Sequence, residues 1–278
     1  MKQITEHVYV ETGYRGCNPG FVETSEGIVM VDTPQRPTDA LNYRREIEKR
    51  GKVRYLINTE PHGDHHAGNC FFDAAGVAHK GTREAMEKIP VDQMKERLRS
   101  IDPDYAPSLD AFSIVLPTIT FNQSMTLYVG DHTIALTNLP GHTASETTVF
   151  IPQERVVFTG DNIFHNVNTC LQEALPNEWL NSLESLKLLD ADFFVPGHGE
   201  VCSKAYLDEQ ASTIREWISA VKEAVGNGWS MEEAQNRISF LERYPMDEEA
   251  AAVGKDLQNR SIAHLYGLAI SGTLDTGG

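Results

Sequence analysis

Histidine and carboxylate residues gather at four places in the chain. The densest group is Glu60-Pro61-His62-Gly63-Asp64-His65-His66, which holds three of the ten histidines. Three later segments each carry one His or Asp beside glycine: Leu139-Pro140-Gly141-His142, Phe158-Thr159-Gly160-Asp161 and Val195-Pro196-Gly197-His198. One charged loop alone is usually a solvated surface feature. Imidazole and carboxylate are the ligands of Zn, Mn and Fe, so the four segments together predict a site for divalent metal ions.

Each of these segments follows a stretch that is predicted to be a strand. The apolar run 54–58 leads into Glu60, and the runs 132–138, 155–158 and 193–195 lead into the three later segments. A strand gives the chain a rigid direction, while glycine lets the following loop turn tightly. We therefore expect a set of strands whose ends bring the ligands to one place.

The rest of the chain alternates between strand and helix patterns. Further strands are expected at 8–10, 21–24, 28–31, 125–129 and 146–151, and helices at 38–50, 82–100 and 177–190. Helical periodicity returns at 207–225, 231–241 and 247–270. Proline interrupts residues 101–120, so the insertion 80–120 is expected to form a lid or pocket wall. The pattern indicates an α+β fold with two sheets face to face and helices outside.

These motifs resemble the metallo-β-lactamase superfamily over roughly residues 4–200. The segment Gly27–Thr33 is similar to the family's strand that ends in aspartate, and the block 60–65 resembles its HxHxDH motif. His142, Asp161 and His198 match the three later ligand positions in the same order. The resemblance implies an αββα sandwich at 1–202 and a helical extension at 203–278 packed on it.

The resemblance also implies two divalent metal ions and a hydrolytic reaction. It assigns the ligands as follows: His62 and His142 to the first metal, Asp64, His65 and His198 to the second, and Asp161 to both. A metal-bound hydroxide would attack an ester, thioester, lactone or amide of a small molecule. Asp64 would also be the catalytic residue that orients the nucleophile and manages its proton.

Glu60 stands where the family motif has its first histidine. Glutamate can ligate through oxygen, so we expect Glu60 to join His62 and His142 at the first metal. The alternative is a displaced Glu60 that leaves a single working metal at the second site. An added carboxylate lowers the positive charge of the centre, which weakens the acidification of bound water. It also makes Mn or Fe plausible beside Zn, the family's commonest metal.

Three further residues are candidates for a substrate pocket. His66 directly follows the motif, and His165 and Asn166 follow Asp161. Phe164 stands where lactonases of the superfamily carry tyrosine, which argues against a quorum-signal lactonase. No function is expected for the histidines that lie outside the motifs: His7, His79, His132 and His264.

Composition and net charge limit the classes of partner that we expect for this protein. The net charge is −16, and such a surface repels a phosphate backbone, so we expect no nucleic-acid partner and no nuclease. No apolar run reaches the roughly 20 residues that span a bilayer, and the first residues lack the apolar core of a secretory signal. Four dispersed cysteines fit reduced thiols. We expect a cytoplasmic protein that is not bound to a membrane and acts on a small molecule; a homodimer stays open.

Three functions stay open at this point. The leading one is the metallo-hydrolase. The second is an iron-dependent, dioxygenase-like oxidoreductase on the same fold, which the oxygen donor of Glu60 favours slightly. The third is a non-catalytic metal-binding relative. A β-lactamase is disfavoured, because those enzymes are usually exported and lack the C-terminal helices. The sequence does not name the substrate, since residues 80–120 and those after 203 carry no motif.

Overall fold

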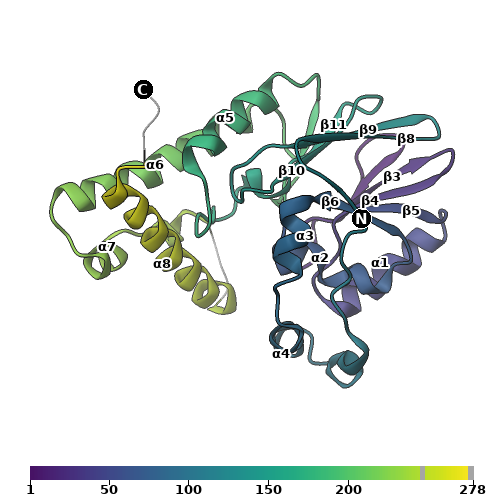
Figure 1. Ribbon diagram of the computed structural model, residues 1–278, viewed down its shortest axis with the longest axis horizontal. Helices are drawn as coiled ribbons and strands as arrows, with labels where there is room; N and C mark the ends of the chain where they lie inside the picture. Colours follow the sequence, from purple (N-terminus) through teal and green to yellow (C-terminus); the bar gives the residue numbers. More distant parts are fainter. Residues whose placement is uncertain (245–247, 275–278) are drawn as a thin grey trace.

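Two stacked β-sheets with helices on both outer faces form the molecule (Figure 1). The computed structural model describes residues 1–244 and 248–274, and only the backbone of 248–252. The predicted αββα sandwich with C-terminal helices is confirmed.

The first sheet has seven strands that lie side by side in chain order. Its strands are β1 (Lys2–Gln3), β2 (Val8–Val10), β3 (Gly20–Thr24), β4 (Gly27–Val31), β5 (Val53–Asn58), β6 (Ala75–His79) and β7 (Ile119–Phe121). Strands β1 to β4 pair antiparallel, and β4 to β7 pair parallel. Parallel pairing requires crossover connections, which α1 supplies between β4 and β5.

The second sheet has five strands in the order β13-β11-β10-β9-β8. Its strands are β8 (Ser124–Val129), β9 (His132–Asn138), β10 (Thr147–Ile151), β11 (Val156–Phe158) and β13 (Phe193–Val195). All neighbours pair antiparallel except β11 and β13, which are parallel. A short parallel pair, β12 (Phe164–His165) with β14 (His198–Gly199), forms a separate two-stranded sheet.

Eight α-helices and four 3₁₀ turns are found in the described residues. The α-helices are α1 (Pro37–Glu48), α2 (Gly63–His66), α3 (Lys80–Met86), α4 (Val91–Ile101), α5 (Pro176–Lys187), α6 (Tyr206–Gly226), α7 (Met231–Arg237) and α8 (Glu248–Ser271). The 3₁₀ turns are η1 (Ala67–Phe71), η2 (Ala106–Ala111), η3 (Gly160–Asn162) and η4 (Leu241–Arg243).

Three apolar layers hold the sandwich together. Between the sheets, alternate residues of the strands form one buried apolar cluster, which includes Val29 of β4 and Val149 of β10. Helix α1 covers the first sheet through the fully buried Tyr43. Trp179 of α5 belongs to the layer outside the second sheet, together with Ile214 of α6 and other residues of α6 and α8. The C-terminal helices therefore share a core with the second sheet; the domain division at 202/203 stays a prediction.

Two predicted helices differ from the structure. Residues 82–100 form two helices, α3 and α4, because Pro90 lies between them and proline disfavours helical geometry at the residue before it. Helix α7 ends at Arg237 rather than near 241, and Ile238 is extended there. Its start is well defined, because Ser230 and Glu233 form a capping box.

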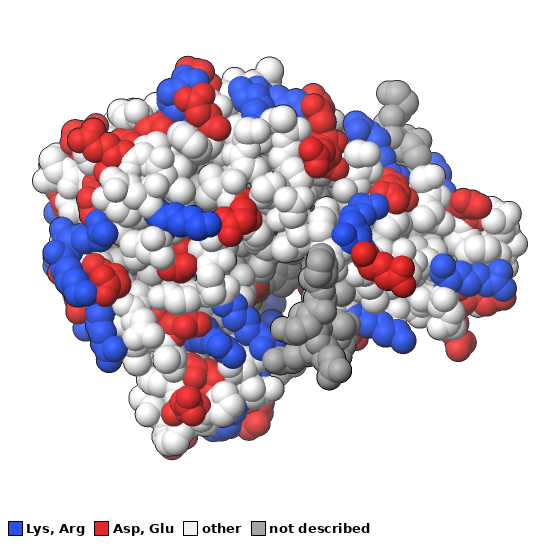
Figure 2. All heavy atoms as spheres, turned by 180° about the vertical axis from the view of Figure 1, so that it is seen from behind, with Lys and Arg blue, Asp and Glu red and all other residues white. Residues whose placement is uncertain are grey.

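Acidic and basic side chains are interspersed on the face shown in Figure 2. Many basic groups are paired, as Arg44 is with Glu48 and Arg50 with Glu23. Within the described part of the chain, no helix combines the length and the apolar character needed to cross a membrane.

Candidate metal centre

The C-terminal ends of five strands bring the site residues to one edge of the sandwich. Asp32 follows β4, Glu60 follows β5, His142 follows β9, Asp161 follows β11, and His198 follows β13. The strands are rigid, so the side chains in the loops after them are held in defined positions.

The first cluster contains Glu60, His62 and His142. His62 Nδ1 lies 2.8 Å from Glu60 Oε2 and 3.2 Å from His142 Nε2. The three side chains each offer one donor atom, and these atoms lie within 4.8 Å of one another. Glu60 and His142 are buried, while 27% of the His62 side chain is exposed, so the cluster opens at His62.

The second cluster contains Asp64, His65 and His198, whose donor atoms also lie within 4.8 Å of one another. His198 Nε2 is 3.4 Å from Asp64 Oδ2, and the rings of His65 and His198 meet edge to face with centroids 5.8 Å apart. His65 is fully buried. The second cluster therefore lies deeper on one side and reaches solvent through Asp64 and His198.

Asp161 lies between the two clusters. Its Oδ1 is 3.2 Å from His65 Nε2, and its Oδ2 is 3.5 Å from His142 Nε2 and 3.4 Å from His198 Nε2. Glu60 also reaches the second cluster, since its Oε1 is 3.2 Å from His65 Nε2. The two clusters thus form one continuous set of donors.

The buried donor atoms of this set are incompletely paired. Glu60 Oε2, His65 Nε2 and Asp161 Oδ1 are buried without a hydrogen bond. Buried polar atoms are normally satisfied, because leaving one unpaired costs free energy. Cations between the clusters would satisfy all three atoms, and the imidazole and carboxylate donors are the types that Zn, Mn and Fe accept. The residues present therefore fit divalent metal ions.

Charge and burial set the protonation of the centre. Burial raises the pKa of the Asp161 carboxyl, but His198 and His65 outweigh burial and hold the pKa well below its ordinary value. Burial lowers the pKa of His142. Asp161 is thus ionised and His142 neutral near pH 7, which are the forms that bind a metal.

Outer hydrogen bonds orient the imidazole rings. His65 Nδ1 lies 2.9 Å from Asp32 Oδ2, and Asp32 in turn accepts hydrogen bonds from the amide and hydroxyl of Thr59. His142 Nδ1 lies 2.8 Å from the carbonyl oxygen of Cys170. Both contacts place the proton on Nδ1 and turn Nε2 toward the centre, as in metal-binding histidines.

Glu146 is a neighbour of the centre that the sequence analysis missed. It is fully buried, and its Oε1 accepts a hydrogen bond of 2.9 Å from the Asp161 amide. Burial, with Glu60 and Asp161 nearby, raises the pKa of Glu146 well above its ordinary value. A Cβ on Gly160, which has φ +53°, would lie 2.1 Å from Glu146 Oε1, so glycine is required there. The available signal was a carboxylate just before the apolar run of β10.

The insertion supports the histidine-rich loop 60–66 from outside. Met94 and Leu98 of α4 pack in one apolar cluster with Ala67, which follows the histidine-rich segment. A Cβ on Gly63 would lie 2.6 Å from Met94 Cε. Helix α4 is therefore in direct contact with the loop; the lid role of 80–120 stays a prediction.

The three pocket candidates lie in different surroundings. His66 is buried, and burial lowers its pKa to about 4, so its ring is neutral at pH 7. His165 packs its ring against Tyr206 and places Nδ1 2.7 Å from the Glu200 carbonyl oxygen. Asn166 has φ +57°, and its backbone N–H donates a hydrogen bond to the Tyr206 hydroxyl. Their pocket role stays a prediction.

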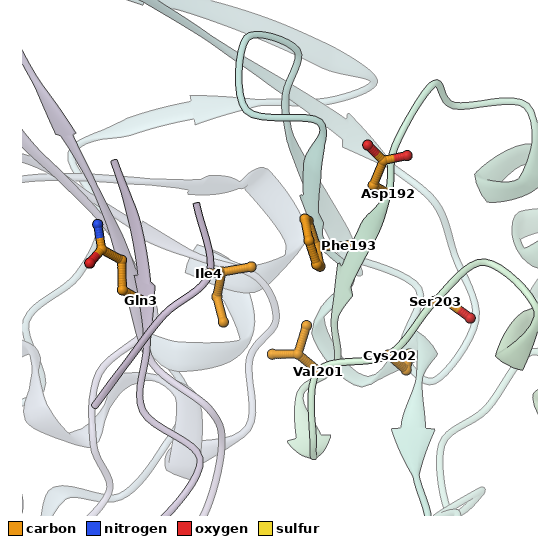
Figure 3. Close-up of a pocket in the computed structure, with 7 residues that line it drawn as sticks. All are labelled: Gln3, Ile4, Asp192, Phe193, Val201, Cys202 and Ser203. Atoms are coloured by element: carbon orange, nitrogen blue, oxygen red, sulfur yellow. The ribbon is translucent and has the colours of Figure 1, made fainter. Parts of the chain in front are cut away.

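Phe164 is a buried core residue that packs against two histidines of the centre. Its ring stacks on His198 with centroids 5.4 Å apart and an interplanar angle of 4°, and it meets His142 edge to face at 5.4 Å. The cavity of about 370 Å³ in Figure 3 is separate: its lining, from Gln3 and Ile4 to Cys202 and Ser203, contains none of the predicted site residues.

Comparison with known proteins gives a consistent match. The model of the metallo-beta-lactamase superfamily matches residues 12–198. The beta-lactamase-like protein 2 homolog of Caenorhabditis elegans is 26% identical over 220 residues, which is 75% of this chain and 66% of that protein. The chain thus spans just under two thirds of that relative. The metallo-beta-lactamase type 2 of Elizabethkingia meningoseptica is 22% identical over 233 residues, covering 78% of this chain and 85% of that protein.

Solved structures agree on the fold. A metallo-beta-lactamase family protein from Thermus thermophilus superposes with a TM-score of 0.70 at 16% identity, over 97% of this chain and 95% of that chain. A metallo-beta-lactamase from Pontibacter korlensis gives 0.59 at 20% identity, over 77% of this chain and 97% of that chain. Because the family model matches residues 12–198, about two thirds of the chain, and the motif segments within that range form one continuous donor set, this chain belongs to the metallo-beta-lactamase superfamily.

Proposed function

We propose that this protein is a metal-dependent hydrolase that cleaves an acyl bond of a small molecule: an ester, a thioester, a lactone or an amide. The observation that carries the proposal is the place of Asp161 between two donor triads, with its two carboxylate oxygens turned toward different histidines. This arrangement suits two neighbouring cations rather than one.

The proposed ligands follow the two clusters. One cation would be held by Glu60, His62 and His142, the other by Asp64, His65 and His198, and Asp161 would contact both. Bound divalent cations would supply a Lewis acid and activate water near neutral pH. Three carboxylates in this set leave less positive charge than a centre whose first ligand is histidine, which favours metals that accept oxygen donors.

Asp64 is proposed as the catalytic carboxylate. Burial raises its pKa, but His65 and His198 outweigh burial and leave the pKa below the ordinary value, so Asp64 is ionised near pH 7. Its side chain keeps 18% of its surface exposed, at the open side of the second cluster. An ionised carboxylate at this place can orient a water molecule by a hydrogen bond and take up its proton.

The rim of the centre bears on the choice of substrate. Glu173, with 64% of its side chain exposed, lies 3.9 Å from His62 Nε2. Its negative charge disfavours substrates that carry an anionic group on that side. A neutral small molecule therefore fits this rim better than a phosphorylated one.

Metal content and hydrolysis of purified protein test the proposal. The protein is prepared without added metal as wild type, Glu60→Ala, Glu60→His and the surface control Glu48→Ala. Metals are counted by mass spectrometry, and a panel of esters, thioesters, lactones and β-lactams is assayed. We expect about two metals in wild type, Glu60→His and the control, and about one in Glu60→Ala, with hydrolysis lost only in the last.

Two results would contradict the proposal. About one metal in all four proteins would remove Glu60 from the ligand set. Iron together with oxygen consumption and no hydrolysis would identify an oxidoreductase on the same fold.

A further inference from the structure

A second group of metal-binding residue types lies at the opposite edge of the sandwich. His7 directly precedes β2, His132 begins β9, and Glu154 lies in the turn between β10 and β11. Strand β9 leads from His132 toward the metal centre over seven residues, which at about 3.3 Å each is roughly 20 Å. This group, the far-edge cluster, is therefore separate from the site described above.

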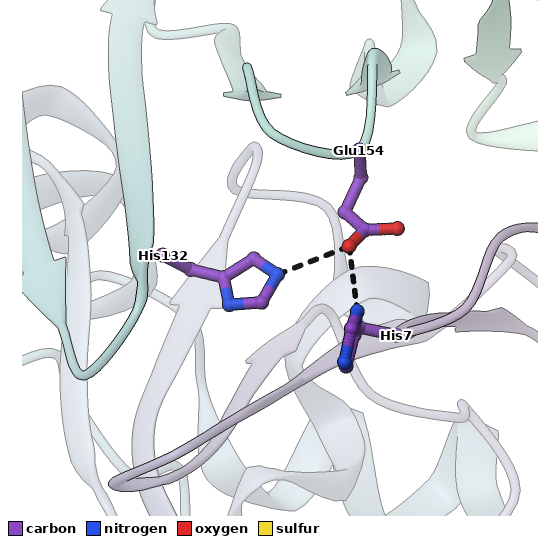
Figure 4. A group of neighbouring side chains, drawn as sticks. All are labelled: His7, His132 and Glu154. Carbon is purple, nitrogen blue, oxygen red and sulfur yellow. Dashed lines mark hydrogen bonds and ion pairs between the residues drawn. The ribbon is translucent and has the colours of Figure 1, made fainter.

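The two imidazole rings of the far-edge cluster converge on one carboxylate oxygen (Figure 4). Glu154 Oε1 lies 2.8 Å from His7 Nδ1 and 3.1 Å from His132 Nε2. The rings meet edge to face with centroids 5.1 Å apart. One donor atom from each residue falls within 4.8 Å of the other two.

The cluster is shielded but can be reached from solvent. The His132 side chain is 3% exposed and that of Glu154 is 9% exposed, while that of His7 is 34% exposed. Shielding strengthens electrostatic interactions, and the open His7 ring leaves a path for an ion and for a water ligand.

Asp131 determines which nitrogen of His132 faces the cluster. Asp131 Oδ1 lies 2.9 Å from His132 Nδ1 and accepts a hydrogen bond of 2.9 Å from the Ser25 amide. Because the carboxylate holds the proton on Nδ1, the neutral ring turns the lone pair of Nε2 toward Glu154. A lone pair and a carboxylate oxygen 3.1 Å apart repel each other unless a proton or a cation lies between them. A carboxylate behind the ring is also typical of metal-binding histidines.

We propose that His7, His132 and Glu154 form a separate site for one divalent cation of the zinc type. Two imidazole nitrogens and one carboxylate supply three ligands, and the open side at His7 leaves the fourth position to water. The cation would link β2 of the first sheet to β9 and the β10–β11 turn of the second, and so stabilise the sandwich. The proposal is independent of the proposed hydrolase activity, and it replaces the expectation that His7 and His132 have no function.

Zinc binding to the chelator-treated protein of residues 1–278 tests the proposal. Wild type is compared with Glu154→Gln and His132→Gln, and with the control Glu48→Gln, which changes an exposed carboxylate of α1 outside the cluster. Each protein is titrated with zinc alone, and bound zinc per chain is counted after dialysis. We expect one zinc ion fewer in both cluster variants than in wild type and the control. The rise in unfolding temperature on adding zinc should also be smaller in the variants.

Equal zinc counts in all four proteins would overturn the proposal. If a cluster variant fails to fold, as judged by circular dichroism, zinc-soaked crystals of wild type decide instead. An anomalous zinc peak between His7, His132 and Glu154 is expected there, and its absence in crystals that show zinc at the other edge would refute the site.

Discussion

The two edges of the sandwich use the same side-chain arrangement in different surroundings. At the metal-centre edge, Asp32 lies 2.9 Å from His65 Nδ1; at the far edge, Asp131 lies 2.9 Å from His132 Nδ1. The side chain of Asp32 is 3% exposed, whereas that of Asp131 is 55% exposed. The hydrogen bond between carboxylate and imidazole is therefore shielded from solvent at the metal-centre edge, whereas its carboxylate is open to water at the far edge.

The edges also differ in how completely their atoms are paired. His65 Nε2 and Asp161 Oδ1 are buried and lie 3.2 Å apart without forming a hydrogen bond, whereas His7 and His132 each hydrogen-bond to Glu154. The metal-centre edge is thus incomplete without cations, while the far-edge cluster can close on itself when one of its rings is protonated. Burial, more than residue type, decides how strongly a cluster depends on a metal.

Replacing Asp161, which lies between the two donor triads, should have the largest effect on metal content and hydrolysis. Asp161→Asn keeps the shape but removes the charge that both triads share. We expect kcat/KM for hydrolysis to fall by more than about 100-fold, beyond what the loss of an outer partner costs, and the metal count to drop. Asp192→Asn, which changes an exposed carboxylate bonded to Arg155, is the control and should leave both values unchanged. An Asp161→Asn protein with normal metal content and rate would contradict the proposed centre.

Asp32→Asn should come next, because it removes the carboxylate that holds the proton on His65 Nδ1. We expect metal affinity at the centre to weaken by about 10 to 100-fold, measured by competition with a chelator. Thr59 also loses an acceptor for its amide or hydroxyl, so unfolding temperature must be recorded in parallel. Unchanged affinity would show that His65 is held without Asp32.

Asp131→Asn is the matched change at the far edge and should have a smaller effect. Water can replace the exposed carboxylate, so we expect zinc affinity of the far-edge cluster to fall only a few-fold, below the lower end of that range. Zinc titration of chelator-treated protein measures it. A loss of zinc affinity as large as the loss of metal affinity caused by Asp32→Asn would mean that burial does not explain the difference between the two edges.

Zinc should reverse the pH dependence of the contribution that His7 makes to the stability of the folded protein. In metal-free protein the hydrogen bond to Glu154, with Glu6 and Asp131 nearby, raises the pKa of His7. A raised pKa in the folded state means that the contribution is full below the ordinary pKa of histidine and is lost as the pH rises through the raised value. Zinc binds the neutral ring, so its contribution grows as the pH rises.

Unfolding temperatures of wild type and His7→Gln over pH 5 to 9 measure this. Without zinc, the difference between the two proteins should shrink with rising pH; with zinc, it should grow. Parallel profiles in both series would leave the far-edge cluster without a metal.

Much of the fold and of the metal centre could be predicted from residue order. Apolar runs predicted the strands that lead into the donor set, but they did not predict β6 and β7. His142, Asp161 and His198 each stand beside glycine after a predicted strand, which marked them as candidate donors. The assignment of each ligand came from the resemblance to the family motif and stays a prediction. The sequence predicted the ends of helices less well. Pro90 divides the predicted helix 82–100 into α3 and α4, and α7 ends at Arg237 although the apolar pattern continues.

What surrounds the donors depended on the tertiary structure. Glu146 meets Asp161, and the carbonyl group of Cys170 meets His142, only because separate loops pack together, and burial then sets their pKa values and hydrogen bonds. His7 and Glu154 are 147 residues apart and carry no motif, and they become neighbours only when the two sheets stack. The sequence by itself determined which side chains can bind a metal; the packing of the sheets decided which of them meet, because distance and burial belong to the folded chain.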